Sequence, residues 1–355
     1  MSSDANDFII KDDDVILITG ASGFIGVKVV ENLLDRGFSN VRCFVRKSIK
    51  ASKLARLHGQ NGGATVQMFE GNLLSPADCV EATRDAKVVI HLAAGRGEKS
   101  FPDAFMNSVV TTRNLLEACH RHQSLRRFVN ISSFAVYSNI NKRPGNLLDE
   151  SSPVELRPDV RGEAYTFAKA KQEELVGDYS RQSGMPVVHV RPGAVYGPEN
   201  PAITGRVGIG TFGIFLHLGG SNRIPFTYVD NCADAIVLAA LKTGVDGEVF
   251  NVVDDDLPTS RQFLRLYKRK VKRFPSLYLP KVASYSLCYL WEGYSKWSDG
   301  QLPAAFNRSR WNSFWKSTKY SNVKLKTKLG WSPTVSTKEG LRRYMAACRG
   351  GVARA

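Results

Sequence analysis

Tyr165 and Lys169 are the two residues of this chain whose types and spacing best suit acid–base chemistry. They stand four positions apart in EAYTFAKAKQEEL, a pattern that predicts a helix over 163–183, so their side chains share one helix face. An ammonium beside a phenol stabilises the phenolate and lowers a pKa that is about 10 in isolation. The pair is therefore predicted to transfer a proton near neutral pH.

A serine is predicted to join this pair. Ser133 ends the apolar segment RFVNISS at 127–133, and a parallel sheet delivers side chains to the crevice beyond its C-terminal strand ends. From there its hydroxyl would hydrogen-bond a substrate oxygen. The Tyr–Lys spacing recurs at Tyr320 and Lys324, but that segment is basic and follows no hydroxyl-bearing strand, so we predict a surface position for it.

Three glycines, Gly20, Gly23 and Gly26, lie between a predicted strand at 15–19 and a predicted helix at 25–36. Glycine permits a tight turn and lets backbone N–H groups approach a pyrophosphate at the helix N-terminus, where the helix dipole favours negative charge. Because the strand precedes and the helix follows, the glycine pattern predicts a dinucleotide site.

The residues at the end of the second predicted strand, 41–45, indicate whether the site binds NAD(H) or NADP(H). An acid there would hold the ribose 2′-hydroxyl of NAD(H), whereas Arg favours the 2′-phosphate of NADP(H). The sequence has Arg46 followed by Lys47, and no Asp or Glu stands between Asp35 and Glu70. We expect NADP(H), with NAD(H) as the alternative.

Apolar segments of strand length alternate with helical patterns through the first part of the chain. The predicted strands cover 15–19, 41–45, 65–70, 87–93, 127–133 and 187–191, and the predicted helices include 25–36, 51–58, 103–122 and 163–183. Strands that are apolar on both faces belong in a central parallel sheet. The expected fold class is α/β, a Rossmann-type doubly wound parallel sheet with a smaller C-terminal substrate-binding lobe.

The predicted domains follow from where this alternation stops. We place the dinucleotide-binding domain at 14–191 and expect the chain to return to it at about 228–255. Gly and Pro become frequent after the first of these ranges, in RPGAVYGPENPAITGRVGIG. Residues 192–227 and 256–350 are assigned to the substrate-binding lobe.

The net charge of +16 is concentrated in one part of the 355-residue chain. Residues 261–355 hold 21 Lys and Arg against three acids, together with all five tryptophans. Such basicity suits an anionic substrate group or a membrane surface; no nucleic-acid recognition motif accompanies it, so nucleic acid is not expected as a partner. A peripheral membrane contact through this lobe and a homodimer are left open.

The sequence carries no recognisable targeting signal. The N-terminal MSSDANDFIIKDDD lacks the basic and apolar regions of a secretory signal, and no apolar run approaches the roughly 18 residues of a spanning helix. The six cysteines form no CxxC pair and no metal-ligand spacing. We expect a cytoplasmic protein, with membrane association open, that acts on a small molecule and holds no metal.

Seven motifs are arranged in order along about residues 14–345. They are GASGFIG at 20–26, HLAA at 91–94, ISSFAVYS at 131–138, YTFAK at 165–169, RPGAVYGP at 191–198, YVDNCADAI at 228–236 and LGWSP at 329–333. Together they resemble the extended short-chain dehydrogenase/reductase family, within the NAD-dependent epimerase/dehydratase superfamily.

This resemblance implies a catalytic triad of Ser133, Tyr165 and Lys169. With Arg46 added on its chemistry, the expected cofactor-binding residues are Thr19, Gly20, Ser22, Gly23, Phe24, Ile25, Gly26, Arg46, Asn72, Leu73, Leu92, Ala93, Ala94, Tyr165, Lys169, Pro192, Gly193 and Val195. The chain departs from the family at Asn72, where Asp is usual; we expect the amide to keep a hydrogen bond to adenine.

The resemblance also bears on the substrate. Sugar-nucleotide members often carry an Arg five residues before the Val of the YVD element, but here Ile224 holds that place and Arg223 is one residue off register. The element GGSNRIPFTYVDNCADA and the segment 279–329 are more similar to the 3β-hydroxysteroid and sterol dehydrogenase branch.

An amphipathic helix is predicted within this basic region. Its apolar face is formed by Ala283, Leu287, Leu290, Trp291 and Tyr294. Aromatic rings beside cations suit a bilayer interface, whereas the alternative is a helix packed on the protein's own core with Lys and Arg in solvent.

Four further residues have other expected roles. We predict that His91 and Arg191 are structural residues of the buried strands and that Trp331 is a core residue. For Arg96, a contact to a substrate anion and a surface ion pair are both open.

The leading hypothesis is an NADP(H)-dependent oxidoreductase that interconverts a secondary alcohol and a ketone on a hydrophobic, steroid-like or lipid-linked substrate. One alternative is a sugar-nucleotide epimerase or dehydratase with tightly bound NAD(P). A second alternative, from another class, is a non-catalytic dinucleotide sensor, which would not need the Ser, Tyr and Lys.

Overall fold

The computed structural model describes residues 7–46, 54, 57, 65–95, 100–139, 143–211, 213–298 and 307–352. Of the sites and elements predicted above, Lys47, Arg96 and most of the helix at 51–58 lie outside these residues. Among the described helices, none combines the length and apolarity needed to cross a bilayer.

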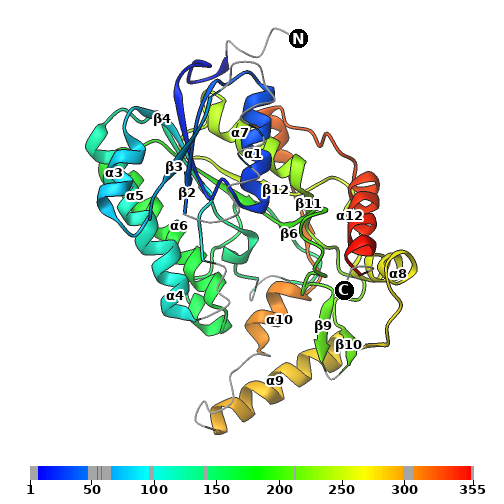
Figure 1. Ribbon diagram of the computed structural model, residues 1–355. Helices are drawn as coiled ribbons and strands as arrows, with labels where there is room; N and C mark the ends of the chain where they lie inside the picture. The colour runs from blue at the N-terminus through cyan, green and yellow to red at the C-terminus, as the bar shows by residue number, and fades with distance from the viewer. Residues whose placement is uncertain are drawn as a thin grey trace.

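A parallel sheet runs through the centre of the molecule (Figure 1). Within the described residues it has seven strands in the order β3-β2-β1-β4-β5-β7-β12. Their bounds are β1 (Val15–Thr19), β2 (Asn40–Val45), β3 (Thr65–Glu70), β4 (Ala86–His91), β5 (Arg127–Ile131), β7 (Val187–Pro192) and β12 (Val249–Val252). The chain begins at the centre, runs to one edge and then returns to build the other half. This order confirms the predicted α/β, Rossmann-type doubly wound sheet.

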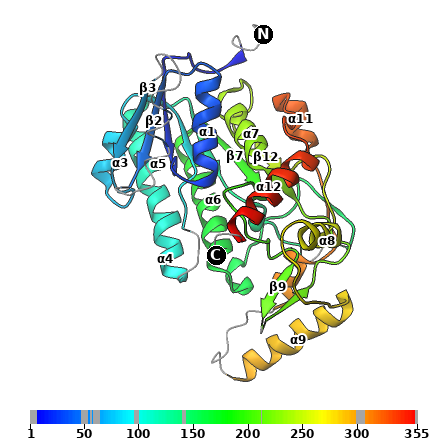
Figure 2. The same ribbon diagram turned by 45° about the vertical axis from the view of Figure 1, so that its right-hand side comes forward.

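Helices cover both faces of the sheet (Figure 2). One face packs against α1 (Phe24–Asp35), α7 (Val229–Leu241) and α11 (Val323–Leu329). The other face packs against α3 (Pro76–Thr83), α5 (Thr111–His122) and α6 (Ala164–Ser183). Because both faces are covered, the central strands are largely apolar on both faces, which is the pattern that identified them in the sequence.

The helix predicted at 103–122 is interrupted. It consists of α4 (Phe101–Phe105), the π turn η4 (Met106–Val110) and α5. Its start is earlier than predicted because Ser100 caps α4 and accepts a hydrogen bond from the backbone N–H of Asp103. π turns inside α-helices occur often at functional sites, and this one lies beside α6, the helix that contains Tyr165 and Lys169.

The remaining elements form a lobe at the C-terminal ends of the strands. It contains β8 (Ala194–Tyr196), β9 (Gly208–Thr211), β10 (Ile214–His217), β11 (Phe226–Tyr228), β13 (Ser276–Tyr278), α8 (Ser260–Lys270), α9 (Lys281–Trp297), α10 (Arg308–Phe314) and α12 (Thr337–Val352). A second core, rich in aromatic rings, joins β8, β11, α8 and α12. Trp331, predicted to be a core residue, is buried and donates its indole N–H to the carbonyl of Asn231 at 3.1 Å.

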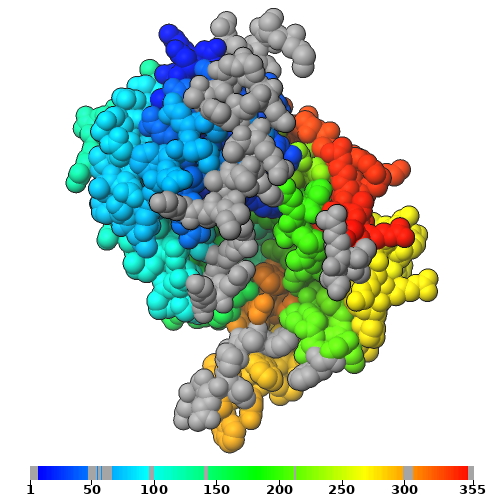
Figure 3. All heavy atoms as spheres, viewed as in Figure 1, coloured from blue at the N-terminus to red at the C-terminus, as the bar shows by residue number. Residues whose placement is uncertain are grey.

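Helix α9 stands away from the body of the molecule, as Figure 3 shows from the side of Figure 1. Four residues of its predicted apolar face, Ala283, Leu287, Leu290 and Tyr294, are exposed, and Trp291 is half-buried. The interpretation in which this face packs on the protein's own core is therefore wrong. The side of the helix that packs carries small residues instead.

Candidate active site

The glycine turn between β1 and α1 has the shape needed for a pyrophosphate. Gly20 has a φ of +71°, a conformation that favours glycine, and a Cβ on Gly26 would lie 2.3 Å from the carbonyl oxygen of Gly20. Gly23 is the N-cap of α1 with no side-chain hydrogen bond, and the first turn of the helix has no acidic residue. The amide groups of this helix end are thus left for an anion, so the turn fits a dinucleotide.

Residues after β4 lie against this turn. The N–H of Leu92 donates to the carbonyl of Thr19 at 3.1 Å, and that of Ala93 donates to the Thr19 hydroxyl at 3.3 Å. Leu92, Ala93 and Ala94 are partly exposed at the strand end, as a cofactor contact requires. The Thr19 side chain is fully buried, so it holds the two strand ends together.

The other predicted cofactor residues lie at neighbouring strand ends. Ser22, Phe24 and Ile25 are partly exposed in the turn itself. Pro192, the last residue of β7, is buried, while Gly193 and Val195 beyond it are partly exposed. A Cβ on Gly193 would lie 2.1 Å from the carbonyl oxygen of Pro225, so this glycine also permits close packing of two chain segments.

The residues predicted to contact the adenosine half lie on β2 and after β3. Arg46 is exposed immediately after β2. Asn72 is exposed, but its Oδ1 accepts from the N–H of Leu74 at 3.0 Å, which leaves the amide N–H group for adenine. Leu73 is buried in the core beneath β3, so its side chain supports the site from inside.

Tyr165 lies in the first turn of α6, and Ser133 follows β5. The two side chains hydrogen-bond each other, so the structure brings together a phenol and a hydroxyl from residues far apart in the chain. Burial raises the pKa of Tyr165 above its ordinary value, and the bond with Ser133 opposes that rise. A buried neutral phenol suits a group that donates a proton to a substrate oxygen.

Lys169 is buried one turn further along α6. Its Nζ donates to the carbonyl of Ile131 at 2.6 Å and to Oε1 of Gln172 at 2.9 Å. Burial lowers the pKa of Lys169 to about 8, and the nearby carboxylate of Glu173 opposes this change. Two of the three N–H groups are thus used for positioning, and the third is the one available for a cofactor ribose or for Tyr165.

The partner of Lys169 belongs to a buried polar network that the sequence did not predict. Gln172 Nε2 donates to the hydroxyl of Thr112 at 2.8 Å, and this hydroxyl is 2.8 Å from Nε2 of His91. The other ring nitrogen, Nδ1, is 2.6 Å from the Thr19 hydroxyl. The chain of contacts therefore connects the end of β1 to Lys169 through residues of four elements.

His91 is uncharged in this network. Burial lowers its pKa to about 3, and the Lys169 ammonium adds to that effect. The predicted structural role of His91 is consistent with its complete burial. Arg191, the other predicted structural residue, makes a buried ion pair with Glu173 and lies over the ring of Tyr137, 4.6 Å from its centroid.

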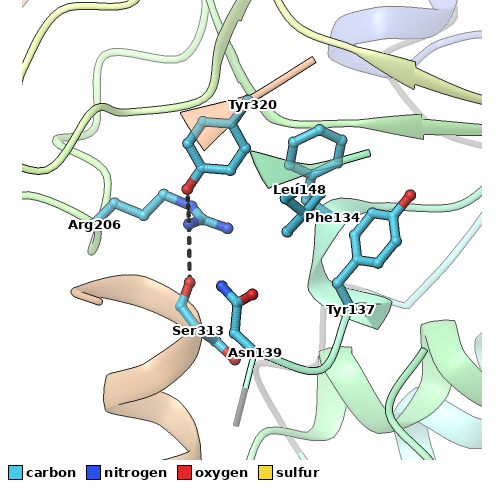
Figure 4. A pocket seen from close by; sticks show the side chains of 7 residues that line it. All are labelled: Phe134, Tyr137, Asn139, Leu148, Arg206, Ser313 and Tyr320. Carbon is cyan, nitrogen blue, oxygen red and sulfur yellow. Dashed lines mark hydrogen bonds between the residues drawn. The ribbon is translucent and has the colours of Figure 1, made fainter. Parts of the chain in front are cut away.

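A small pocket has Phe134, the residue after Ser133, in its wall (Figure 4). It is lined by Phe134, Tyr137, Asn139, Leu148, Arg206, Ser313 and Tyr320. Arg206 Nη1 donates to the carbonyl of Ser313 at 3.0 Å and approaches the Tyr320 hydroxyl at 3.5 Å. The pocket thus combines an aromatic wall with one cation.

The surface position predicted for Tyr320 and Lys324 is wrong for the tyrosine. Tyr320 belongs to β14 (Lys319–Tyr320), which pairs with β6 (Leu147–Leu148), and its ring stacks on Phe134 at 5.7 Å. Lys324 points elsewhere and forms an ion pair with Glu248 at 2.5 Å. The tyrosine was missed because only the fold brings this short strand beside Ser133.

Ile224, and not Arg223, occupies the position five residues before Val229 in the structure as in the sequence. Ile224 is buried in the second core. Arg223 is exposed and donates to the carbonyl of Leu257 at 2.9 Å. The arginine therefore does not replace the buried isoleucine in the site.

A comparison with models of protein families identifies the family of this chain. The model of the NAD dependent epimerase/dehydratase family matches residues 16–252, which include the glycine turn, Ser133, Tyr165 and Lys169. The chain belongs to this family. As a member, it is an NAD(P)-dependent enzyme of the extended short-chain dehydrogenase/reductase type, and the interpretation as a non-catalytic sensor is set aside.

Two groups of epimerase/dehydratase relatives are similar to the chain. A trifunctional UDP-glucose 4,6-dehydratase, epimerase and reductase of Arabidopsis thaliana is 29% identical over 256 residues, which are 67% of this chain and 36% of that protein. The chain thus spans about a third of the length of this relative. A decarboxylating sterol-4-alpha-carboxylate 3-dehydrogenase of Saccharomyces cerevisiae is 27% identical over 351 residues, covering 94% of this chain and 97% of that protein.

Solved structures of the epimerase/dehydratase family have the same fold. A UDP-glucuronic acid 4-epimerase from Bacillus cereus, in complex with UDP-glucuronic acid and NAD, has a TM-score of 0.69 at 24% identity and covers 94% of this chain and 99% of its own. A UDP-glucose 4-epimerase from Thermotoga maritima has a TM-score of 0.68 at 22% identity, covering 95% and 99%.

Proposed function

We propose that the protein is an NADP(H)-dependent oxidoreductase that interconverts a secondary alcohol and a ketone on a hydrophobic, steroid-like or lipid-linked substrate. The observation that carries this proposal is the extent of the match to the sterol dehydrogenase of Saccharomyces cerevisiae, which covers 94% of the chain. The match to the UDP-sugar enzyme of Arabidopsis thaliana covers 67%. Similarity that continues through nearly the whole chain includes the segments that we assign to the substrate-binding lobe, 192–227 and 256–350.

Three residues would carry the proton chemistry. In the oxidation direction, Tyr165 takes the proton of the substrate hydroxyl, while Ser133, which hydrogen-bonds Tyr165, keeps the substrate oxygen in place. The charge of the Lys169 ammonium favours the phenolate, and its third N–H holds the nicotinamide ribose. The cofactor, when bound, takes up or supplies the hydride. In the reduction direction Tyr165 returns the proton to the oxygen.

The preference for NADP(H) rests on Arg46. Its exposed position after β2 suits a contact with a 2′-phosphate. We expect Arg46→Ala to raise KM for NADP(H) at least tenfold and to leave KM for NAD(H) nearly unchanged, because only the former carries the phosphate. Arg113→Ala, at an exposed pair on α5, is the control. Equal effects on both cofactors would contradict the assignment.

Two features support a hydrophobic substrate over a sugar nucleotide. The position from which many sugar-nucleotide enzymes present an arginine is occupied by the buried Ile224. The pocket beside Ser133 has a mostly aromatic and aliphatic wall, with Arg206 as its cation. Such a wall suits contact with an apolar part of a substrate.

The competing function is a UDP-sugar epimerase or dehydratase with NAD(P) retained through the catalytic cycle. It is favoured by the relatives in Arabidopsis thaliana and by the solved epimerases. The two functions differ in net cofactor turnover, since an epimerase regenerates its cofactor.

The deciding experiment supplies purified protein with NADP(H) or NAD(H) and either 3β-hydroxysteroids and their 4-carboxylates or UDP-sugars. We expect steroid oxidation with stoichiometric formation of reduced nicotinamide, followed by its ultraviolet absorbance. Tyr165→Phe protein serves as the inactive control. Conversion of UDP-sugars without net change in the nicotinamide would overturn the proposal and establish the competing function.

A further inference from the structure

Helix α9 turns its apolar side chains away from the protein. Val282 is 80% exposed, Trp297 78%, Leu290 66% and Tyr289 57%. A helix on the surface of a globular protein normally buries such side chains and exposes its polar ones. Contiguous exposed apolar surface of this kind marks a site of interaction.

The inward side of α9 is built for close packing. Its buried residues are the small Ser284, Cys288 and Ser295. Ser284 accepts a hydrogen bond from the indole N–H of Trp311 at 2.9 Å, and Trp311 packs edge-on against Tyr285. Rotating the helix to bury its apolar face would break these contacts, so the outward direction is a stable property of the fold.

The acidic residue of the helix does not share the exposed face. The Glu292 side chain is 20% exposed, and its carboxylate pairs with Arg308 at 3.0 Å and with Lys296 at 3.5 Å. Lys281 stands at the first position of the helix, and Lys296 lies near its end with a side chain that is 75% exposed. Among the described residues of α9, the exposed ones are therefore mostly apolar or aromatic, and Lys296 is the charged residue among them.

The part of the chain that precedes α9 is also cationic. The last turn of α8 holds Lys268, Arg269 and Lys270, and Lys272 and Arg273 are exposed in the segment that leads towards α9. Over 261–355 the chain carries 21 basic residues against three acidic ones. Two copies meeting through this face would bring two strongly positive lobes together, whereas a negatively charged bilayer would attract it.

We propose that α9 is a membrane-binding helix that lies in the interface of an anionic bilayer. Val282, Tyr289, Leu290 and Trp297 enter the boundary between headgroups and acyl chains, and the lysines contact the headgroups. The proposal goes beyond the proposed function, because it concerns where the protein binds and holds for any substrate.

The position of α9 relative to α6 connects membrane binding to the proposed active site. Helix α10, which packs on α9, contacts the start of α6 through two bonds: Asn307 Nδ2 donates to the carbonyl of Arg161 at 2.9 Å, and Arg310 Nε pairs with Glu163 at 3.2 Å. Glu163 is two residues before Tyr165. The bilayer-facing helix is thus connected by one helix to the acid–base residue.

The test is cosedimentation of the full-length protein, with NADP(H) present, with two kinds of vesicle. Vesicles of phosphatidylcholine with about a third phosphatidylserine are compared with phosphatidylcholine alone. We expect binding to the anionic vesicles that weakens as salt is raised, and at least tenfold weaker binding for Leu290→Ser/Trp297→Ser. The matched control is Val323→Ser on α11, which removes another exposed apolar side chain from the same basic region.

The substituted residues are exposed, so thermal unfolding of the variants should match that of the native protein. Quenching of tryptophan fluorescence by brominated lipid, present in the native protein and reduced in Trp297→Phe, would place the helix end in the bilayer. Unchanged vesicle binding by Leu290→Ser/Trp297→Ser would overturn the proposal. So would a native dimer that does not bind vesicles and becomes monomeric in this variant, since the face would then join two copies.

Discussion

At the scale of single residues, the site separates the groups that react from the groups that hold them. Ser133 and Tyr165 hydrogen-bond each other at the substrate side. Lys169 directs two bonds into the protein, to Ile131 and Gln172. Because a buried ammonium without acceptors is costly, these partners decide its position, whereas burial lowers its pKa and Glu173 opposes that change.

Tyr165→Phe tests the reacting group. Removing the phenolic hydroxyl should lower kcat by about 10² to 10⁴-fold, the usual contribution of general acid–base catalysis, and leave cofactor affinity largely unchanged. Turnover is measured with saturating substrate, and cofactor binding by fluorescence titration. Retention of most of the native kcat would exclude Tyr165 as the acid or base.

The pH dependence tests the positioning of Lys169 by Gln172. Since burial lowers the pKa of Lys169 to about 8, the ammonium is present below that pH and is lost above it. The rate of ketone reduction should therefore fall as pH rises through about 8.

Two substitutions should move this decline in opposite directions. Gln172→Leu removes an acceptor from the ammonium and should shift the decline to lower pH, whereas Gln172→Glu adds a nearby negative charge and should shift it to higher pH. The measurement is kcat/KM against pH for the three proteins. A decline at one common pH would show that Gln172 does not act through Lys169.

At the scale of elements, the ends of strands and the starts of helices form the site. The turn between β1 and α1 is one tightly packed example, because a Cβ on Gly26 would lie 2.3 Å from the carbonyl oxygen of Gly20. The interrupted helix made of α4, η4 and α5 is another: its π turn lies beside α6, and Thr112 in α5 reaches His91 and Gln172.

Gly26→Ala tests the turn. The added methyl group must push α1 away from the turn, and we expect a loss of about 1–3 kcal/mol in stability, with at least tenfold weaker cofactor binding. The control is Gly177→Ala in the middle of α6, where the nearest atom to the new Cβ would be Arg181 Nη1 at 3.4 Å.

That control should gain about 0.5–1 kcal/mol, because alanine favours the helix over glycine. Both values come from chemical denaturation with isothermal titration of the cofactor. Native-like cofactor binding by Gly26→Ala would show that the close approach in the turn is not required.

At the scale of the whole molecule, the basic lobe and the catalytic helix are coupled at Glu163. Its carboxylate is 3.2 Å from Arg161 Nη2 and 3.2 Å from Arg310 Nε of α10. The Arg161 side chain is 1% exposed, so this carboxylate balances a buried charge at the base of the lobe.

Glu163→Gln should lower the free energy of unfolding by about 3 kcal/mol, because it leaves the buried guanidinium of Arg161 without its carboxylate. It should also raise KM for the substrate more than it lowers kcat, since α10 loses a contact with the catalytic helix. Glu81→Gln, in an exposed pair with Arg84, should change stability by less than about 0.5 kcal/mol. Similar thermal unfolding of the two variants would contradict the coupling.

The sequence by itself determined the features that depend on neighbouring residues. The alternation of apolar strands and helices, the glycines of the turn and the spacing of Tyr165 and Lys169 are local patterns, because each reflects the backbone of one turn, strand or helix. The ranges 15–19 and 65–70 coincide with β1 and β3 for this reason.

Only the tertiary structure decided which distant residues meet and which way a face points. Thr19, His91, Thr112 and Gln172 come from four elements, and no spacing along the chain indicates their contacts. Tyr320 reaches the site through a two-residue strand that is too short to carry a pattern. The periodicity of α9 defines an apolar stripe, but the packing of Ser284 against Trp311 turns that stripe outward. Helical periodicity gives the angular position of a residue about the helix axis. The environment of that residue depends on what packs against the helix.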